Sequence, residues 1–352
     1  MTTNRVSADQ SCFVIAEAGV NHNGDRRLAL ELIDAAAQAG ADAVKFQSFR
    51  ADKLVRTGTP TTTYQKDNSG ETDQLAMLRK LELTPAVFRE LAARCLEKGI
   101  EFMSTPFDQE SLELLLDLGM RRIKIPSGEL TNHPFLTQLA GTGRPLILST
   151  GMATIEEVSE AVSAIAESLP PQMSADRLAN ALTLLHCTSN YPTSPGDVNL
   201  RAILTLRERF GLPTGFSDHT NGIIASVAAT AMGATVIEKH FTLSQALPGP
   251  DHPMSLEPAE FAEMIASIRL VNRMSGDGVK APRKSELAVR DLVRRSVVAA
   301  RDIPADCIVG TADFTFLRPG TGLAPRELSA IVGRRTRQLI AKGTLVGWDQ
   351  FI

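Results

Sequence analysis

Short apolar runs alternate with helix-like stretches over most of the chain. Each of the eight runs ends in polar or charged residues: FVIAEAG from Phe13, AVKFQS from Ala43, IEFMSTPF from Ile100, RIKIPSGE from Arg122, PLILSTG from Pro145, LTLLHCTS from Leu182, PTGFSDHT from Pro213 and TVIEKHFT from Thr235. Buried strands that alternate with helices are typical of βα units, and eight such units close a barrel of roughly 250 residues. The pattern therefore predicts an α/β protein built on a (β/α)8 TIM barrel.

Local signals indicate where the intervening helices begin and end. Residues 25–38 form an amphipathic stretch, and Gly40 after it can take the left-handed conformation that ends many helices. Thr84 followed by Pro85 is typical of an N-cap with proline at the first helical position. Thr154, with Glu157 three residues later, predicts a capping box. These signals place helices between the predicted strands.

Two stretches interrupt the alternation and divide the chain. Residues 50–74 are polar and rich in threonine, which predicts a long loop after the second strand. This loop would lie on the functional face, either as a substrate lid or as a solvent-exposed insertion. Residues 275–286 are turn-rich and basic, which is typical of a linker. The sequence thus predicts a polar leader at residues 1–10, a barrel at 11–274, a linker at 275–286 and a small β-rich domain at 287–352.

Composition and charge narrow the classes of function. Hydrophobic residues make up 43% and charged residues 22% of the chain, which is typical of a soluble globular protein. The net charge of −3 offers no basic surface, so we expect neither nucleic acid nor a membrane as a partner. No apolar run reaches the roughly 18 residues of a membrane span. Scattered cysteines without a CxxC spacing favour reduced thiols and a cytoplasmic protein: Cys12, Cys95, Cys187 and Cys307.

The residues at the predicted strand ends are suited to an anionic ligand. The carboxyl ends of barrel strands share one face, where active sites lie. Lysine ammonium groups supply charge for phosphate or carboxylate, and serine and threonine hydroxyls add hydrogen bonds. A single serine would more simply be a turn or cap residue, but its recurrence at successive strand ends predicts an anion site. The candidates are Lys45, Lys124, Ser104, Thr105, Ser127, Ser149, Thr150, Ser189 and Ser217.

Carboxylates and histidines add further candidate chemistry. Glu17 follows the first strand, where it either acts as an acid or base or serves as a structural hydrogen-bonding group. His219 and His240 end the seventh and eighth strands, which are neighbours in a barrel. Two imidazoles can bind one metal ion and leave positions for oxygen ligands, which suits Mn²⁺, or Mg²⁺ or Co²⁺, as a Lewis acid. His186 is a third candidate, for which a core position is the simpler interpretation, and Asp251 can reach a substrate hydroxyl.

Motifs in order along the barrel match one family closely. They are EAGVNHNG from Glu17, VKFQS from Val44, STPF from Ser104, KIPSGE from Lys124, LSTGM from Leu148, HCTSNYP from His186, FSDHT from Phe216, EKHFT from Glu238 and PGPD from Pro248. With these motifs the chain resembles the sialic acid synthases, which include the enzymes that make N-acetylneuraminic, legionaminic and pseudaminic acids. The C-terminal segment, with LRPGTG from Leu317, looks like the antifreeze-like (SAF) domain of these enzymes.

The resemblance implies a transferase of polysaccharide biosynthesis. In this family phosphoenolpyruvate condenses with the open-chain aldehyde of an N-acyl mannosamine-type sugar, with C–O cleavage, to give a nine-carbon 2-keto-3-deoxy acid and phosphate. The resemblance further implies that the family's dimers exchange their C-terminal domains, so that one residue reaches the sugar from the partner subunit. The implied roles are phosphoenolpyruvate binding by Lys45, Thr105, Lys124, Ser127, Ser149, Ser189 and Ser217; sugar binding by Gln47, Tyr191, Asp251 and, across the dimer, Arg318; metal binding by His219 and His240; and catalysis by Glu17, Glu129 and His219.

Several alternatives stay open from the sequence. The expected product is N-acetylneuraminate or N,N′-diacetyllegionaminate, with pseudaminate as an alternative. A sugar 6-phosphate would require extra cations in the lid region, where Arg50, Lys53, Arg56 and Lys66 leave the matter open. A barrel aldolase would form a Schiff base between a lysine and pyruvate, whereas the hydroxyls near the two lysines favour charge–charge binding. An ice-binding tail would show a regular threonine repeat, which the sequence near Leu317 lacks.

Overall fold

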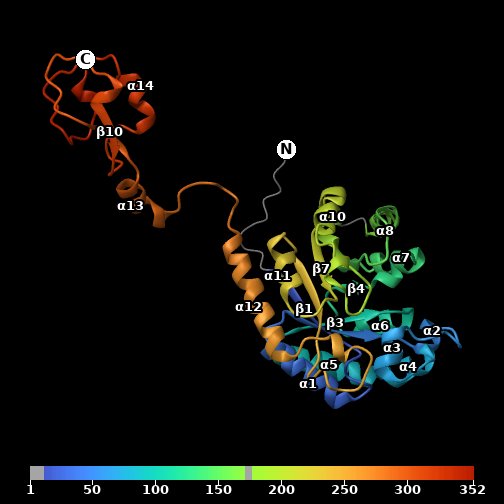
Figure 1. The fold of residues 1–352 in the computed structure, drawn as a ribbon. Helices are drawn as coiled ribbons and strands as arrows, with labels where there is room; N and C mark the ends of the chain where they lie inside the picture. The colour runs from blue at the N-terminus through green and yellow to red at the C-terminus, as the bar shows by residue number, and fades with distance from the viewer. Residues whose placement is uncertain (1–11, 171–176) are drawn as a thin grey trace. The chain divides into compact units, whose positions relative to one another are not determined.

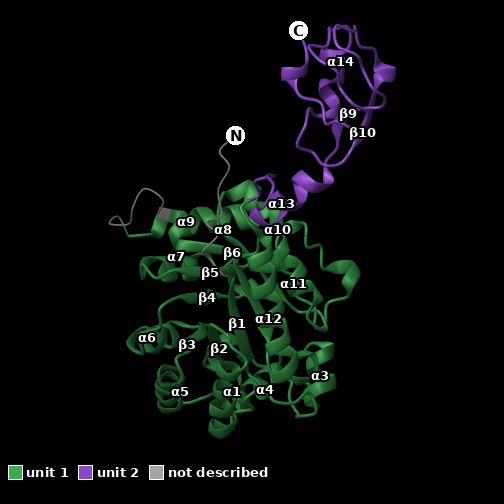
Figure 2. Ribbon diagram, turned by 90° about the vertical axis from the view of Figure 1, so that its left-hand side faces the viewer, with its two compact units in different colours: residues 1–277 green, residues 278–352 purple. Residues whose placement is uncertain are grey.

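The computed structural model describes residues 12–170 and 177–352, which form two compact units. The units comprise residues 1–277 and 278–352 (Figure 2). Their boundary lies inside the stretch that the sequence analysis assigns to a linker. The leader predicted at residues 1–10 lies outside the described residues.

Eight parallel strands form the centre of the first unit. The hydrogen-bonded order is β3-β2-β1-β8-β7-β6-β5-β4, and β3 and β4, at the two ends of this order, also contact each other. The sheet therefore curls into a barrel, which confirms the predicted fold class. The strands are β1 (Phe13–Gly19), β2 (Ala43–Ser48), β3 (Glu101–Pro106), β4 (Ile123–Ile125), β5 (Leu146–Ser149), β6 (Leu182–Cys187), β7 (Thr214–Asp218) and β8 (Val236–His240).

Helices follow the strands and surround them (Figure 1). Each amphipathic helix places its apolar side against the sheet, as α1 does with its buried Leu32 and Ile33. None of the helices in the described part of the chain is long and apolar enough to cross a membrane. The helices of this unit are α1 (Arg26–Gln38), α2 (Ala51–Leu54), α3 (Thr63–Ser69), α4 (Gln74–Leu81), α5 (Pro85–Lys98), α6 (Gln109–Asp117), α7 (His133–Gly141), α8 (Ile155–Ser168), α9 (Arg177–Ala181), α10 (Ala202–Phe210), α11 (Ile224–Ala231) and α12 (Pro258–Ser275).

The local signals in the sequence explain most helix ends. Thr84 caps α5, which has Pro85 in its first turn, and the Thr154–Glu157 capping box begins α8. Gly40, after α1, takes a φ of +86°, a left-handed conformation that glycine adopts without a steric penalty. The expectation of a continuous loop at residues 50–74 was wrong, because α2 and α3 lie within it.

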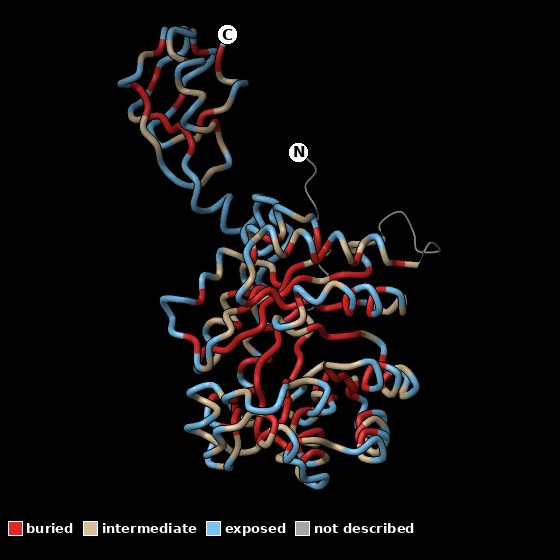
Figure 3. The backbone as a smooth tube through the Cα atoms, turned by 90° about the vertical axis from the view of Figure 1, so that its right-hand side faces the viewer, coloured by how far each residue is buried: buried red, intermediate tan, exposed pale blue. Residues whose placement is uncertain are grey.

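Two successive layers of side chains fill the barrel, and their order explains where the site lies. The lower layer is a buried apolar cluster of Ile15, Ala43, Met103, Ile147, Leu185 and Val236. Alternate residues of a strand point to the same side, so the residue two positions further along each strand also points inward. Those residues are Glu17, Lys45, Thr105, Ser149, Cys187 and Glu238. In Figure 3 the buried segments run along the strands.

The second unit is small and has its own core. It contains α13 (Lys284–Val293), the antiparallel strands β9 (Ser296–Ala299) and β10 (Phe314–Leu317), and α14 (Leu328–Ile331). Helix α13 begins at Lys284, inside the stretch predicted as a linker. The core is made by Val297, Ala299, Ile303, Val309, Phe314, Leu323, Ile331, Ile340, Val346 and Phe351.

Candidate functional site

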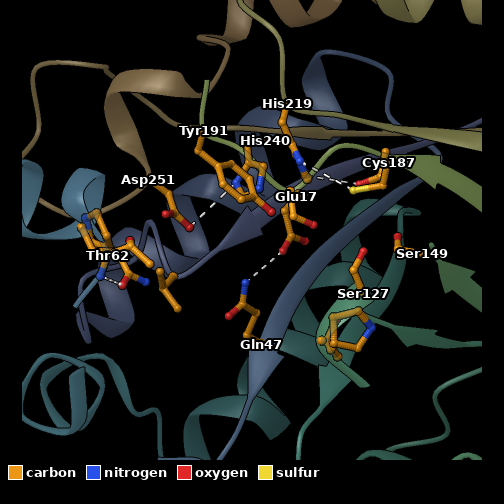
Figure 4. A pocket seen from close by; sticks show the side chains of 18 of the residues that line it. Glu17, Gln47, Thr62, Ser127, Ser149, Cys187, Tyr191, His219, His240 and Asp251 are labelled. Carbon is orange, nitrogen blue, oxygen red and sulfur yellow. Dashed lines mark hydrogen bonds and ion pairs between the residues drawn. The ribbon is translucent and has the colours of Figure 1, made fainter. Parts of the chain in front are cut away.

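A cavity of about 410 Å³ opens at the carboxyl ends of the barrel strands. Its floor is the polar layer above the apolar cluster, and parallel pairing brings its members together. Glu17 is in register with Lys45 on one side and with His240 on the other, while Ser217 is in register with Glu238. Figure 4 shows Glu17, Ser127, Ser149 and the histidines around this space.

Two lysines and two glutamates make the floor a buried network of charges. Lys45 Nζ lies 2.5 Å from Glu17 Oε2 and 3.6 Å from Glu238 Oε2. Lys124 Nζ lies 3.5 Å from Glu238 Oε1. All four side chains are less than one tenth exposed, so Glu238 lies between two ammonium groups in a setting where charge interactions are strong.

Burial and pairing shift the pKa values of these groups in different directions. Burial would raise the pKa of Glu238, but the ammonium groups of Lys124 and Lys45 lower it to about 2. Burial works against the charge of Lys45, yet the Glu17 and Glu238 carboxylates raise its pKa. Burial lowers the pKa of Lys124, whose nearest carboxylate, that of Glu238, also pairs with Lys45. Lys124 is therefore the cation that an anionic ligand would stabilise most.

Hydroxyl groups from several strands surround the lysines. Thr105 Oγ1 accepts a hydrogen bond from Lys45 Nζ at 3.1 Å, and Ser217 Oγ donates to Glu238 Oε1 at 3.0 Å. The buried Ser149 Oγ has no hydrogen-bond partner among the described residues, although it faces the cavity. Ser127 and Ser189 also line the cavity. Seven of the nine predicted anion-site residues thus line one cavity, with donor groups left for a ligand, whereas Ser104 and Thr150 do not line it.

His219 and His240 both line the cavity, and their ring centroids lie 5.6 Å apart. His219 Nδ1 lies 2.7 Å from the carbonyl oxygen of Thr188, which can only accept, so Nδ1 carries a hydrogen and the neutral ring has its lone pair on Nε2. Burial and the neighbouring His219 lower the pKa of His240 well below its usual value, which keeps this ring neutral. The buried His240 Nδ1 lacks a hydrogen-bond partner among the described residues.

The two histidines fit a divalent metal ion as a pair of nitrogen ligands. Metal ligation requires neutral imidazoles, and a backbone carbonyl that binds the other ring nitrogen orients such a ligand. The described part of the chain has no group of three or more His, Cys, Asp and Glu side chains that would enclose a metal. The arrangement therefore suits an ion whose remaining ligands are oxygen atoms of substrate or water.

The outer part of the cavity has a different character. The ring of Tyr191 lies 4.0 Å from that of His219, and Asp251 Oδ2 lies 3.9 Å from His240 Nδ1. Burial and the nearby Glu17 raise the pKa of Asp251 to about 7. Gln47 Nε2 donates to Glu17 Oε1 at 3.2 Å. The wall around these side chains combines apolar residues (Val20, Met77, Leu78, Leu81 and Phe107) with uncharged polar ones (Thr62, Gln65 and Gln74).

Some residues predicted for the site lie elsewhere. Glu129 does not line the cavity; its carboxylate accepts a hydrogen bond from Asn132 Nδ2 at 2.7 Å. It follows Ser127 by two positions in a 3₁₀ turn, which rotates it by about 240° from the serine. Ser104 is buried against Ser48. His186 binds the carbonyl of Val198 at 2.7 Å, in line with a core position. Arg318 is exposed in the second unit.

Three further residues that the sequence analysis did not assign to the site also line the cavity: Glu238, Tyr64 and Cys187. Glu238 precedes His240 by two positions on β8, so strand alternation places both side chains on the same side. Tyr64 lies in the stretch expected as a loop, and only its aromatic character in a threonine-rich segment marks it. Cys187 likewise lines the cavity, two positions after the inward-facing Leu185.

Comparisons with known proteins identify the family of the chain. Residues 32–280 match the model of the NeuB family, and residues 294–352 match that of the SAF domain. The chain is 48% identical to the N,N′-diacetyllegionaminic acid synthase of Legionella pneumophila over 97% of this chain and 95% of that protein. It is 44% identical to the enzyme of the same name from Campylobacter jejuni, over 92% of this chain and 95% of that protein.

A solved structure of similar function has the same fold. It is the N-acetylneuraminic acid (sialic acid) synthetase of Leptospira borgpetersenii, in a complex with citrate. The match has a TM-score of 0.69 at 35% identity and covers 79% of this chain and 90% of that one.

Proposed function

The chain belongs to the NeuB family, and from this membership and the chemistry of its cavity we propose that it condenses phosphoenolpyruvate with an N-acyl mannosamine-type sugar. The products are a nine-carbon 2-keto-3-deoxy acid and inorganic phosphate. The observation that carries the proposal is the floor of the cavity: two buried ammonium groups, surrounded by hydroxyls, beside the imidazoles of His219 and His240.

The floor matches a small, doubly anionic donor. Phosphoenolpyruvate carries a phosphate and a carboxylate on three carbons, so it needs two cations and several hydrogen-bond donors close together. Lys45 and Lys124 supply the cations, and Ser127, Ser149 and Ser189 supply hydroxyls. Fixing the enol carbon against the aldehyde makes the reaction effectively unimolecular and can lower the barrier by several kcal/mol.

The histidines lie where the aldehyde of the sugar would meet the donor. A divalent ion held by His219 and His240 would supply Lewis-acid polarisation of the aldehyde oxygen. Mn²⁺, Mg²⁺ and Co²⁺ suit this mixed set of nitrogen and oxygen ligands. Tyr191, packed on His219, forms the side of the cavity next to this position.

Glu17 is the carboxylate best placed to handle protons. It lines the cavity, is buried, and pairs with Lys45 at 2.5 Å. Attack by the enol carbon forms the carbon–carbon bond and leaves positive charge on carbon 2 of the donor, which a water molecule captures. The resulting tetrahedral carbon then expels inorganic phosphate by cleavage of its C–O bond, which leaves the keto group. We assign deprotonation of that water to Glu17, because burial raises its pKa and makes it a stronger base than an exposed carboxylate.

For the sugar, we propose the 2,4-diacetamido-2,4,6-trideoxy precursor of N,N′-diacetyllegionaminate. Two relatives of that name are 48% and 44% identical to this chain. Among the described residues that line the cavity, the cations are Lys45 and Lys124, both on the floor, whereas the outer wall combines apolar side chains with the uncharged Thr62, Gln65 and Gln74. Such a wall accommodates a deoxy sugar with acyl methyl groups and disfavours a 6-phosphate.

A phosphate-release assay tests the proposal. The enzyme, phosphoenolpyruvate and Mn²⁺ are combined in turn with the diacetamido-trideoxy sugar, N-acetylmannosamine and its 6-phosphate. We expect the highest kcat/KM with the first sugar. No phosphate release with any of them would refute the condensation.

Isotope and trapping experiments separate the two carbon–carbon bond-forming mechanisms. With oxygen-18 in the bridging position of phosphoenolpyruvate, the label should leave with phosphate. A lysine aldolase would instead be trapped covalently on pyruvate by borohydride, and that result would replace the proposal.

The C-terminal unit enters the proposal through Arg318. We propose a homodimer in which Arg318 contacts the acyl group of the sugar from the partner subunit, and a cytoplasmic enzyme. Mixing Arg318→Ala with Lys45→Gln protein should restore part of the activity in mixed dimers. No recovery in verified mixed dimers would place Arg318 in the site of its own chain or outside it.

A further inference from the structure

Residues 61–72 form a small closed structure at the mouth of the cavity, which we call the lid tip. An antiparallel bridge between Pro60 and Asp73 closes its base, and the N–H of Thr61 donates to the carbonyl oxygen of Thr72 at 3.2 Å. Inside the tip, α3 begins at a capping box and ends at Gly70, whose φ of +74° is left-handed. The lid tip is therefore a structured segment with its own hydrogen bonds and not an irregular loop.

The side chain of Tyr64 reaches from the lid tip to the rest of the cavity. Its ring centroid lies 5.3 Å from that of Tyr191, and both rings line the cavity. The chain has two tyrosines in all, so both lie at this place. Tyr191 contacts His219 and meets His240 edge-on with centroids 5.6 Å apart. A row of aromatic rings thus leads from the two histidines to the lid tip.

The lid tip is attached to the loop that carries Asp251. Asn68 Nδ2 donates to the carbonyl oxygen of Pro250 at 2.8 Å. Glu71, at the other end of the tip, forms an ion pair with Lys80 on α4. Because Pro250 directly precedes Asp251, one loop both presents Asp251 to the cavity and receives the tip.

We propose that Tyr64 is a specificity-determining residue, whose ring contacts the distal half of the bound sugar and is held there by Asn68. The inference rests on the proposed function. With the aldehyde at His219 and His240, an open-chain sugar extends past Tyr191, and its distal carbons and acyl group reach Tyr64. An aromatic ring offers these groups a large apolar face at small cost in conformational entropy.

Steady-state kinetics of Tyr64 variants test the proposal. Tyr64→Ala should raise the KM for the diacetamido-trideoxy sugar by about tenfold, the effect of losing one good contact, and leave the KM for phosphoenolpyruvate within twofold. Tyr64→Phe keeps the ring and should stay within threefold of the wild type. Tyr64→Leu keeps most of the side-chain volume but removes the ring, so it should behave like the alanine variant. It replaces the alanine variant in the test if that variant does not fold. Lys66→Ala, on the exposed side of α3, is the matched control and should change neither KM.

The ratio of kcat/KM for the diacetamido-trideoxy sugar over N-acetylmannosamine should fall in Tyr64→Ala. Asn68→Asp, which has nearly the size of asparagine but no N–H donor, should raise the same sugar KM by a few-fold. An unchanged sugar KM in Tyr64→Ala and Tyr64→Leu, or an equal rise for both substrates, would overturn the proposal. Wild-type enzyme that releases no phosphate with any sugar would instead sink the proposed reaction, so the two failures are distinguishable.

Discussion

The floor and the outer wall of the cavity differ in how they are built. The floor residues Glu17, Lys45 and Glu238 lie on strands and are locked by ion pairs of 2.5 and 3.6 Å. The outer wall comes from helices and loops, with Leu78 on α4 and Tyr64 on α3. Strand ends hold charges in fixed positions, whereas loops can change without loss of the fold. We therefore expect substitutions in the floor to abolish the reaction, and substitutions in the outer wall to change which sugar the enzyme prefers.

Removing a lysine from the floor should have the largest effect. We expect Lys45→Gln to lower kcat/KM for phosphoenolpyruvate by about 1,000-fold, or about 4 kcal/mol, because truncating one partner of a buried charge pair costs about 2–5 kcal/mol. It also leaves the Glu17 and Glu238 carboxylates without their shared cation. The same substitution at the lid residue Lys53, which is half exposed, should be neutral. A loss below tenfold at Lys45, in protein with normal thermal stability, would contradict the assigned role.

Removing a proposed metal ligand should have the next largest effect. We expect a chelator to stop phosphate release and Mn²⁺ to restore it. His240→Ala should weaken Mn²⁺ binding in calorimetry and lower turnover by at least about 100-fold, since even outer-shell partners of metal ligands contribute about 10–100-fold. His133→Ala, at the start of α7, is the control. Unaltered Mn²⁺ affinity in the His240 variant would exclude it as a ligand.

Two buried histidines that do not line the cavity, His22 and His252, should give the protein a moderate dependence of stability on pH. Burial lowers the pKa of His22 from 6.5 to about 4, and burial also lowers that of His252 to about 4. Between these values the unfolded chain binds protons that the folded chain does not, so stability is full above pH 6.5 and falls as the pH drops towards 4. For His22 alone the loss between pH 7 and pH 5 is about 2 kcal/mol.

Urea unfolding followed by far-ultraviolet circular dichroism checks this dependence. His22→Asn keeps an acceptor for the N–H of Gly24, which His22 Nδ1 binds at 3.0 Å, but it cannot take up a proton. The variant should therefore lose less stability between pH 7 and pH 5 than the wild type. His133→Asn should leave the difference unchanged. Equal losses in the His22 variant and the wild type would contradict the assignment.

A change of charge in the outer wall should have the smallest effect. It tests most directly whether the wall, and not the floor, determines which sugar is bound. Leu78→Arg places a cation beside the distal end of the sugar. We expect the preference for the trideoxy sugar over N-acetylmannosamine 6-phosphate to shift towards the phosphate by about tenfold, or 1.4 kcal/mol. Leu78→Met, which keeps this position apolar, should retain the original preference. An unchanged preference in the arginine variant would place the distal end of the sugar elsewhere.

Much of the floor could be predicted because its residues follow apolar runs directly. Ser149 ends β5, Thr105 and Ser217 lie one position before the ends of β3 and β7, and Lys45 lies within β2. The parallel barrel gathers the carboxyl ends of these strands on one face. Even the pairing of His219 with His240 follows from the neighbouring positions of β7 and β8. The order of residues along each strand was sufficient to predict these positions, because each strand contributes its own residue to the face of the barrel on which the cavity lies.

The remaining part of the site depends on contacts between segments that are far apart in the sequence, which local sequence patterns do not predict. Glu129 looked equivalent to Glu17 but turns away after β4, because the 3₁₀ turn rotates it out of the cavity. Tyr64 joins the site because α3 folds back over the mouth and Asn68 binds Pro250, 182 residues further along the chain.

The barrel, the polar residues at its strand ends and the anionic character of the ligand could all be predicted from the sequence. Strand periodicity and strand order are visible locally in the sequence, and parallel pairing then places the strand ends on one shared face. Only the tertiary structure decided which charges compensate each other, as Glu238 does between Lys45 and Lys124, and which loop side chains complete the cavity. The physical reason is that Coulomb energies and ring contacts depend on separations of a few ångströms between segments far apart in the chain.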